Sequence, residues 1–338
     1  MYAVVLVGGF GTRLRPLTNE IPKPMLPVVH RPMIVRLVER LAEGGVTDVV
    51  LALGFKPEPF REAFPDARHG DVRVQYAVEP EPLDTAGAIA FAAREAGIDE
   101  TFVVANGDIV TDLDVKRLVD AHRSARSEAM IHLTPVADPS AFGVVETDPT
   151  GTVRRFVEKP APGETDSNLI NAGTYVLEPS VLDLIEPGRK VSIERETFPR
   201  LVAQGTLAAL ATDDYWIDAG RPSMYLRANL DLVSGRVTGR LGSGDEPAIA
   251  PTATVDPSAR CVDSVVGAGA TVAGGASLTA SLILPGAVVG ERSTIADSIV
   301  AGHVGAGASV AGSVIGAGHR VPDDATVVDR ILPPPDDT

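Results

Sequence analysis

The sequence predicts an α/β protein in two parts, a Rossmann-like, mostly parallel sheet flanked by helices and then a left-handed parallel β-helix. Two periodicities predict this division. Up to about residue 232, short apolar runs alternate with stretches of helical spacing, whereas from about residue 247 aliphatic residues recur at every sixth position. With 338 residues the chain is long enough for two domains. We place them at 1–238 and 247–330, joined by the Gly-rich stretch 239–246.

The first part alternates strands and helices. We expect strands over 3–7, 49–53 and 101–105, and helices over 33–43 and 83–96. The first helix ends at Gly44 and Gly45, a common stop signal. This alternation of strands and helices along the chain predicts a mostly parallel sheet with helices on both faces.

The second part is poor in charge, and its aliphatic residues form short groups with a step of six. The groups are Ile249 and Val255; Val266, Val272 and Leu278; Ile283, Val289 and Ile295; Val304 and Val310; Ile315, Val321 and Val327. Ser264, Ser281 and Ser298 are 17 residues apart, and Ser313 follows 15 later. Hexapeptides in threes predict a triangular coil with aliphatic side chains inside and small residues at the corners. A flexible linker would not keep this phase.

Composition restricts the function and the location. The chain has 30 basic against 45 acidic residues, a net charge of -15, which is unlike a general nucleic-acid binder. A local basic cluster can still bind phosphate. Cys261 is the only cysteine, so no intrachain disulfide forms, and no apolar stretch is long enough for a membrane span. We expect a soluble, cytoplasmic protein with no membrane or nucleic-acid partner.

The most informative stretch follows the first strand and reads Gly-Gly-Phe-Gly-Thr-Arg-Leu-Arg-Pro-Leu-Thr over 8–18. Its glycines let the backbone approach a ligand and turn amides toward an anion. Arg13 and Arg15 add donors suited to phosphate oxygens, and Lys23 follows in the proline-stiffened segment 22–27. The stretch is neither a Walker A loop nor a dinucleotide fingerprint. A tight strand-to-helix turn is the alternative, but three cations close by favour phosphate binding.

Together with Pro-Lys-Pro-Met at 22–25, this loop resembles the signature of the sugar-1-phosphate nucleotidyltransferases. Members of that family join a nucleoside triphosphate to a sugar 1-phosphate and release pyrophosphate. The resemblance implies that the loop wraps the triphosphate, that Arg13 contacts the departing pyrophosphate, and that Lys23 neutralises phosphate charge. It covers about residues 2–232, and the hexapeptide tail extends it to about 328.

Two aspartates match the metal-binding positions of the family. Asp108 ends the run Asn-Gly-Asp at the carboxyl end of a predicted strand, the edge at which open α/β sheets bind ligands. Asp218 lies in the stretch 215–222. The resemblance implies that both hold Mg²⁺, which prefers oxygen ligands and bridges to phosphates. For either aspartate alone, a turn or capping role is the alternative.

The stretch 156–160, Phe-Val-Glu-Lys-Pro, resembles the sugar-phosphate motif of the family. By this resemblance Lys159 grips the phosphate of the sugar 1-phosphate and Glu158 accepts from sugar hydroxyls; a surface ion pair is the alternative. The other matched positions of the sugar pocket are Gly143 and Asn171. We interpret the segment 191–199, which also resembles the family, as mainly structural.

The stretch 79–87 aligns with the base-recognition loop of the family. Thymidylyl and uridylyl members usually carry Gln where this chain has Glu79, and a carboxylate can accept from guanine N1–H and N2–H, which favours GTP. Asp84 departs from the usual Gly, so the choice of nucleotide stays open. The nucleotide-binding residues implied by the resemblance are Gly8, Gly9, Gly11, Thr12, Arg13, Lys23, Glu79, Asp84, Thr85 and Gly107.

Within the family, the chain resembles the mannose-1-phosphate guanylyltransferase-like members most. We therefore expect GTP and mannose 1-phosphate as substrates, and the alternative is thymidylyl or uridylyl transfer to glucose 1-phosphate. The catalytic residues implied are Arg13, Lys23, Asp108 and Asp218. A non-catalytic regulatory subunit and a hexapeptide acyltransferase are alternatives of another class; the latter would depend on His303 or His319. By resemblance to longer members, we expect the β-helix to mediate regulation or homo-oligomer contacts.

Overall fold

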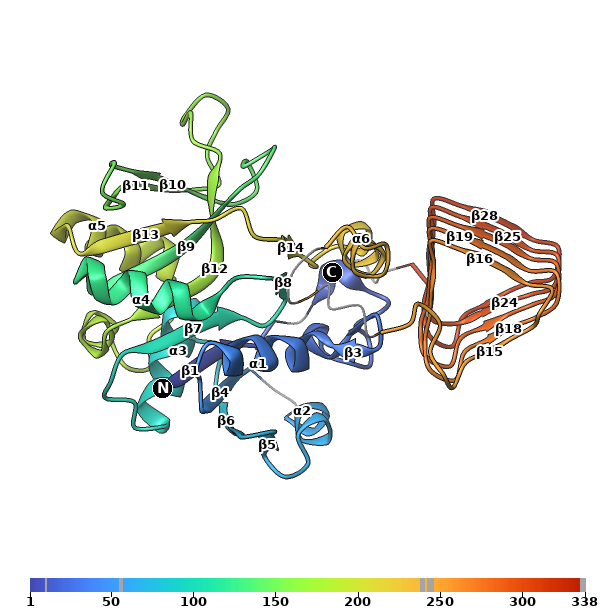
Figure 1. Ribbon diagram of the computed structural model, residues 1–338, viewed down its shortest axis with the longest axis horizontal. Coiled ribbons are helices and arrows are strands. Elements are labelled where there is room, and N and C mark those ends of the chain that lie inside the picture. Colours follow the sequence, from blue (N-terminus) through green and yellow to red (C-terminus); the bar gives the residue numbers. More distant parts are fainter. Residues whose placement is uncertain (10, 55–56, 238–240, 242–245, 335–338) are drawn as a thin grey trace. The chain divides into compact units, whose positions relative to one another are not determined.

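The computed structural model describes residues 1–9, 11–54, 57–237, 241 and 246–334 (Figure 1). The chain divides into two compact units, Met1–Gly9 with Ile34–Trp216 and Phe10–Met33 with Ile217–Thr338. The division therefore passes through the Gly-rich loop after Gly9. Most of the expected junction 239–246 lies outside the described residues.

The first unit is built on a sheet in which the described residues form ten strands, in the order β11-β10-β12-β7-β1-β4-β6-β5, with β9 paired to β12 and β13 to β9. The strands are β1 Tyr2–Leu6, β4 Asp48–Leu53, β5 Arg68–His69, β6 Val72–Val78, β7 Phe102–Asn106, β9 Ala129–Pro135, β10 Gly143–Thr147, β11 Val153–Glu158, β12 Leu169–Leu177 and β13 Leu207–Ala211. At the centre, β1 runs parallel to both β4 and β7, and β6 runs parallel to β4. This confirms the mostly parallel, Rossmann-like sheet, to which β12, β10 and β11 add antiparallel strands.

Helices cover both faces of this sheet. They are α1 Met33–Glu43, α2 Glu58–Ala63, α3 Asp84–Glu95, α4 Val115–Ala125 and α5 Phe198–Gln204, with the short helices η3 Pro179–Leu184 and η4 Ile193–Thr197. Val4 of β1 packs in one core cluster with Ile89 of α3. Its neighbours Ala3 and Val5 point to the opposite face and are equally inaccessible to solvent. A strand buried on both faces explains the continuous apolar run seen in the sequence.

In the second unit, residues 254–332 form three parallel sheets of five strands each (Figure 1). The first contains β15 Thr254–Val255, β18 Thr271–Val272, β21 Val288–Val289, β24 His303–Val304 and β27 Arg320–Val321. The second contains β16 Arg260–Val262, β19 Ser277–Thr279, β22 Thr294–Ala296, β25 Ser309–Ala311 and β28 Thr326–Val328. The third contains β17 Val265–Val266, β20 Leu282–Ile283, β23 Ile299–Val300, β26 Val314–Ile315 and β29 Ile331–Leu332. This confirms the parallel β-helix; its left-handed sense stays a prediction.

The hexapeptide positions form the interior of the β-helix. The fully buried cluster contains Val266, Val272, Leu278, Ile283, Val289, Ile295, Val304, Val310, Ile315 and Val321, as expected. Val255 and Val327 are only partly buried beside it, and Ile249 is exposed, contrary to the prediction. The cluster also contains Val300, which the step of six misses. The reason is a shortened corner: two residues, 301–302, separate β23 from β24, whereas four separate β17 from β18. Gly302 makes that corner possible, because a Cβ there would lie 2.3 Å from the His319 carbonyl oxygen.

The serines spaced by 17, 17 and 15 residues form a buried ladder. Ser281 N donates to Ser264 Oγ at 3.1 Å, Ser298 N to Ser281 Oγ at 3.3 Å, and Ser313 N to Ser298 Oγ at 3.0 Å. Each hydroxyl donates in turn to the carbonyl two residues before it. The ladder satisfies backbone groups at a tight corner that would otherwise be buried without a partner.

The remaining elements of the second unit are the helical turns η1 Thr12–Leu14 and η2 Lys23–Met25, the hairpin β2 Pro27–Val28 and β3 Arg31–Pro32, and the helix α6 Pro222–Val233. The helix α6 packs against β17 and β20 of the β-helix. No helix within the described residues is both long and apolar enough to cross a membrane.

Candidate active site

Residues 11–18 of the signature loop form a compact turn in the second unit. Gly11 has φ +61°, a left-handed conformation that glycine adopts without strain. The Thr18 hydroxyl donates to the Gly11 carbonyl at 2.8 Å and closes the loop. Thr12 and Arg13 are exposed on the following turn, while Leu14 is buried beneath them. The loop therefore presents Arg13 outward on a fixed base.

Lys23 is the most constrained cation of the expected site. It is only 6% exposed, and its Nζ lies 3.3 Å from Asp218 Oδ1. A Cβ added to Gly220 would lie 3.1 Å from Lys23 Nζ and 3.2 Å from Arg13 Nη2. The structure thus brings together three residues that the sequence assigned to catalysis: Arg13, Lys23 and Asp218.

The helix α6 holds the segment that carries Lys23. The Asn229 side chain is fully buried; it accepts from Val29 N at 2.6 Å and donates to the Tyr225 carbonyl at 2.8 Å. The Tyr225 hydroxyl donates to the Pro27 carbonyl at 2.6 Å. Val29 has φ +59°, which is unusual for a β-branched residue, and the Asn229 bond compensates for this strain.

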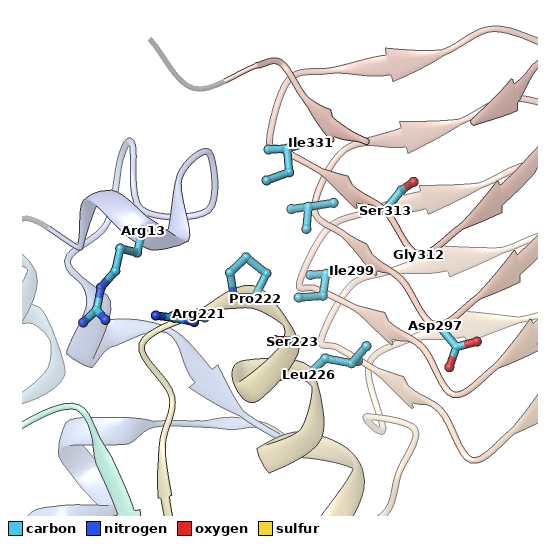
Figure 2. A pocket seen from close by; sticks show the side chains of 11 residues that line it. Arg13, Arg221, Pro222, Ser223, Leu226, Asp297, Ile299, Gly312, Ser313 and Ile331 are labelled. Carbon is cyan, nitrogen blue, oxygen red and sulfur yellow. The ribbon is translucent and has the colours of Figure 1, made fainter. Parts of the chain in front are cut away.

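A cavity of about 740 Å³ lies within the second unit, next to Arg13 (Figure 2). Arg13 and Arg221 line one end, and aliphatic residues of the β-helix, Ile299 and Ile331, line the other. The lining therefore combines two arginines with aliphatic side chains and the carboxylate of Asp297.

In the first unit, Asp108 follows β7, as predicted. The neighbouring Gly107 is enclosed, because a Cβ there would lie 2.6 Å from Val7 Cγ1 and 2.9 Å from the Leu6 carbonyl oxygen. Gly107 therefore lets the chain pass close to β1 as it turns toward Asp108. Asp108 also raises the pKa of Tyr175, a minor contribution beside burial. Asp108 is therefore close enough to Tyr175 for its charge to act on the hydroxyl of that residue.

Glu158 ends β11 opposite Gly143 of β10, and Lys159 follows it directly. A Cβ at Gly143 would lie 2.9 Å from Glu158 Oε2, so glycine leaves room for this carboxylate. Burial, and then the nearby charge of Glu194, raise the pKa of Glu158. Lys159 Nζ is 3.8 Å from Glu158 Oε1 on a 60% exposed side chain, and its backbone has φ +51°. A strained backbone and an exposed cation are common where a side chain is aimed at a ligand.

Asn171 and Thr85 use their side chains within the protein. Asn171 Nδ2 donates to the Tyr175 hydroxyl at 2.9 Å, and its Oδ1 accepts from Gly173 N at 3.0 Å. The Thr85 hydroxyl donates to Glu194 Oε2 at 2.8 Å and accepts from Ile193 N at 2.8 Å. In this structure both side chains are engaged by hydrogen bonds to other residues of the first unit.

The base-recognition loop contains one buried carboxylate and one unusual backbone. Glu79 Oε2 accepts from Leu83 N at 2.8 Å, and burial raises the pKa of Glu79. Asp84 has φ +60°, a left-handed conformation that glycine adopts most readily. Asp tolerates this conformation better than most residues, and its carboxylate accepts from Thr85 N at 2.7 Å. Asp84, in place of the glycine expected from the resemblance, therefore allows the loop to keep its left-handed backbone conformation at this position.

Sequence reasoning missed two parts of the site. Glu194 lies in the segment 191–199, which we interpreted as mainly structural. Its carboxylate nevertheless accepts a hydrogen bond from Thr85, and its charge raises the pKa of Glu158. Gly220 and Arg221 lie in the same stretch, 215–222, as Asp218, but the sequence analysis assigned a role to Asp218 alone. Among the described residues no group of three or more His, Cys, Asp or Glu side chains could hold a metal ion. A metal site of two aspartates and phosphate oxygens would not form such a group.

The fold combines an α/β sheet with a parallel β-helix, and the cluster of Arg13, Lys23 and Asp218 is of a kind that suits phosphorylated ligands. The chain belongs to the nucleotidyl transferase family, whose model matches residues 2–235, and a GlmU-like C-terminal hexapeptide model matches residues 247–331. It is therefore a nucleotidyltransferase with a hexapeptide-repeat domain.

Curated relatives agree with this assignment. The chain is 41% identical to a mannose-1-phosphate guanylyltransferase of Mycobacterium tuberculosis over 84% of this chain and 80% of that protein. It is 39% identical to a probable mannose-1-phosphate guanylyltransferase 2 of Oryza sativa over 90% and 86%. Among solved structures, HddC from Yersinia pseudotuberculosis complexed with GMP-PN is similar with a TM-score of 0.58, 32% identity, and coverage of 68% of this chain and 97% of that one.

Proposed function

We propose that this enzyme transfers a nucleotidyl group from GTP to mannose 1-phosphate, producing GDP-mannose and pyrophosphate. The observation that carries the proposal is the convergence of Arg13, Lys23 and Asp218 beside Gly220. The curated relatives are named for this reaction, and Glu79 supplies an acceptor suited to guanine.

The reaction needs no protein nucleophile, because an oxygen of the sugar phosphate attacks the α-phosphorus in line and pyrophosphate leaves. The protein has to place two anions together, and each pair of unit charges 4 Å apart repels by about 4 kcal/mol at an effective dielectric near 20. In the proposal Arg13 and Lys23 offset this repulsion on the triphosphate side and Lys159 on the sugar-phosphate side.

Mg²⁺ would be held by Asp108 and Asp218, whose carboxylates are the hard oxygen donors that this ion prefers. Asp218 suits a cation, since Lys23 Nζ already lies 3.3 Å from its Oδ1. When bound, Mg²⁺ supplies positive charge against the developing charge on phosphate oxygens. The remaining proposed ligand contacts are those of Gly8, Gly9, Gly11, Thr12, Asp84 and Gly107 with the nucleotide, and of Gly143, Glu158 and Asn171 around the sugar.

The nucleotide and the sugar can be tested directly. A matrix of GTP, dTTP, UTP, ATP and CTP against sugar 1-phosphates, with pyrophosphate release as the readout, should give the highest kcat/KM for GTP with mannose 1-phosphate. A preference for dTTP or UTP with glucose 1-phosphate would overturn the specificity and keep the reaction class. Acetyl-CoA consumption without pyrophosphate release would favour the acyltransferase alternative.

We also propose a cytoplasmic homo-oligomer that associates through the β-helix, with domains at 1–238 and 247–330. The second sheet of the β-helix supports this, because one of its two outward-facing columns is uncharged: Val262, Thr279, Ala296, Ala311 and Val328. Val262 and Val328 are 36% and 51% exposed. Light scattering should report an oligomer that Ala296→Arg dissociates, whereas a monomeric wild-type chain would refute the association.

A further inference from the structure

Gly220 occupies a special place two residues after Asp218. A Cβ at this position would lie 2.7 Å from Asp218 Oδ1, 3.1 Å from Lys23 Nζ and 3.2 Å from Arg13 Nη2. The φ of Gly220 is outside the left-handed region, so the backbone conformation does not require glycine. What the position requires is empty space.

We infer that Gly220 is a positioning residue, which leaves the space in which Arg13, Lys23 and Asp218 converge. A methyl group there meets each of the three functional side chains at its charged end, at distances that van der Waals radii make tight or forbidden. The three ends must then move apart, and the cation–carboxylate cluster that the proposed reaction uses loses its arrangement. Displacements of about 1 Å in such clusters reduce rates by about 10²-fold.

Other enclosed glycines are surrounded by different atoms, and this difference predicts that a substitution at Gly220 affects activity without affecting stability. At Gly107 and Gly302 a Cβ would meet backbone atoms, at 2.9 Å from the Leu6 carbonyl oxygen and 2.3 Å from the His319 carbonyl oxygen. A substitution there strains the fold itself. At Gly220 all three contacts are the ends of flexible side chains, which can move without moving the backbone. The change should therefore reach the site and spare the stability of the protein.

The matched control is Gly274 in the β-helix, whose backbone also lies outside the left-handed region. A Cβ at Gly274 would come no closer than 3.3 Å to Ser258 Oγ, an exposed side chain remote from Lys23 in the chain. Gly274→Ala makes the same chemical change and removes the same backbone freedom as Gly220→Ala, but it displaces no charged group of the proposed site.

The experiment compares wild type, Gly220→Ala and Gly274→Ala. We expect Gly220→Ala to lower kcat/KM for nucleotidyl transfer by about 10- to 100-fold and to weaken pyrophosphate binding in calorimetry, with a melting temperature within about 3 °C of wild type. Gly274→Ala should match wild type in all three measurements. Equal kinetics and equal pyrophosphate affinity in Gly220→Ala and Gly274→Ala would overturn the inference, as would a melting temperature of Gly220→Ala that falls by more than about 5 °C.

Coupling to Lys23 provides a second test. If the methyl group acts by displacing Lys23 and its neighbours, Gly220→Ala should weaken pyrophosphate binding less in a Lys23→Ala background than in wild type, because one displaced group is already absent. Strict additivity would contradict the inference. The inference rests on the proposed function only for the expected change in kcat/KM, since pyrophosphate binding can be measured without turnover. A wild-type chain that releases no pyrophosphate with any substrate pair would refute the proposed function, and the pyrophosphate affinities would still decide on Gly220.

Discussion

The two regions of this molecule place their important residues by different means. In the β-helix a residue's environment follows from its position in a short repeat, and the Ser264–Ser281 hydrogen bond joins residues 17 apart. In the catalytic region the bond between Thr85 and Glu194 spans 109 residues, and the pair Lys23–Asp218 spans 195. The comparison teaches that local periodicity specifies a scaffold, whereas a site for two charged substrates is assembled from distant segments.

Removing one distant carboxylate should give the largest effect. We expect Asp108→Asn to lower kcat by about 10³-fold, equivalent to ~4 kcal/mol, because the substituted amide no longer offers a charged oxygen to Mg²⁺. Pyrophosphate release with saturating Mg²⁺ measures this effect, and a melting curve checks the fold. Asp120→Asn on the exposed face of α4 is the control and should retain full activity. Activity of Asp108→Asn near that of wild type would refute the assignment.

A change inside the repeat should instead reduce stability. Ile295 is fully buried in the β-helix, and Ile295→Ala should lower the free energy of unfolding by about 2–5 kcal/mol through lost apolar contact and the cavity left behind. Urea denaturation measures this, with Thr294→Ala on the outer face of the same strand as the control. A loss below about 1 kcal/mol would mean that the coil relaxes around the cavity.

The serine ladder offers a smaller test of the same region. Ser298 Oγ accepts from Ser313 N at 3.0 Å and donates to the Ala296 carbonyl at 2.6 Å. Ser298→Ala leaves a buried N–H without an acceptor and should lower the free energy of unfolding by about 1–3 kcal/mol. Ser309→Ala, on the outer side of β25, should change it by less than about 0.5 kcal/mol. Equal losses in the two variants would remove the ladder from the explanation of stability.

In the catalytic region, GTP binding should weaken as the pH falls, because Glu79 becomes protonated at a higher pH than an ordinary carboxylate. Burial raises the pKa of Glu79, so as the pH falls Glu79 takes up its proton at a higher pH than an ordinary glutamate. The protonated side chain loses one acceptor for guanine N–H groups, and the KM for GTP should rise several-fold as the pH falls, starting at a higher pH than for an ordinary glutamate. Glu79→Gln, which does not titrate, should lack this added rise. Parallel pH profiles of KM for the two proteins would count against Glu79 as the base acceptor.

The smallest effect concerns Asp84. Because Asp84 already adopts φ +60°, Asp84→Gly keeps the loop conformation and removes only the bond to Thr85 N. We expect the ratio of kcat/KM for GTP over dTTP to change by less than about threefold, or ~0.7 kcal/mol. A larger change in the nucleotide matrix would give the Asp84 carboxylate a direct role in base selection.

The sequence by itself determined the order of elements and most of the buried positions. The strands at Tyr2–Leu6, Asp48–Leu53 and Phe102–Asn106 and the helix Met33–Glu43 lie within one residue of the expected bounds, because apolar period and glycine stops are local signals. The hexapeptide phase likewise predicted most of the β-helix interior. It failed at Val300, where the shortened corner breaks the step of six, and at Ile249, which is 38% exposed.

Only the tertiary structure decided which charged residues share a space and which residues leave room for them. The Lys23–Asp218 pair, the contact of Glu194 with Thr85 and the gap at Gly220 depend on side chains brought together across long stretches of chain. A motif predicts the residue type that chemistry requires. It does not predict the distance between two side chains, because that distance is set by how α6 and the strand ends pack, and packing is a property of the whole fold.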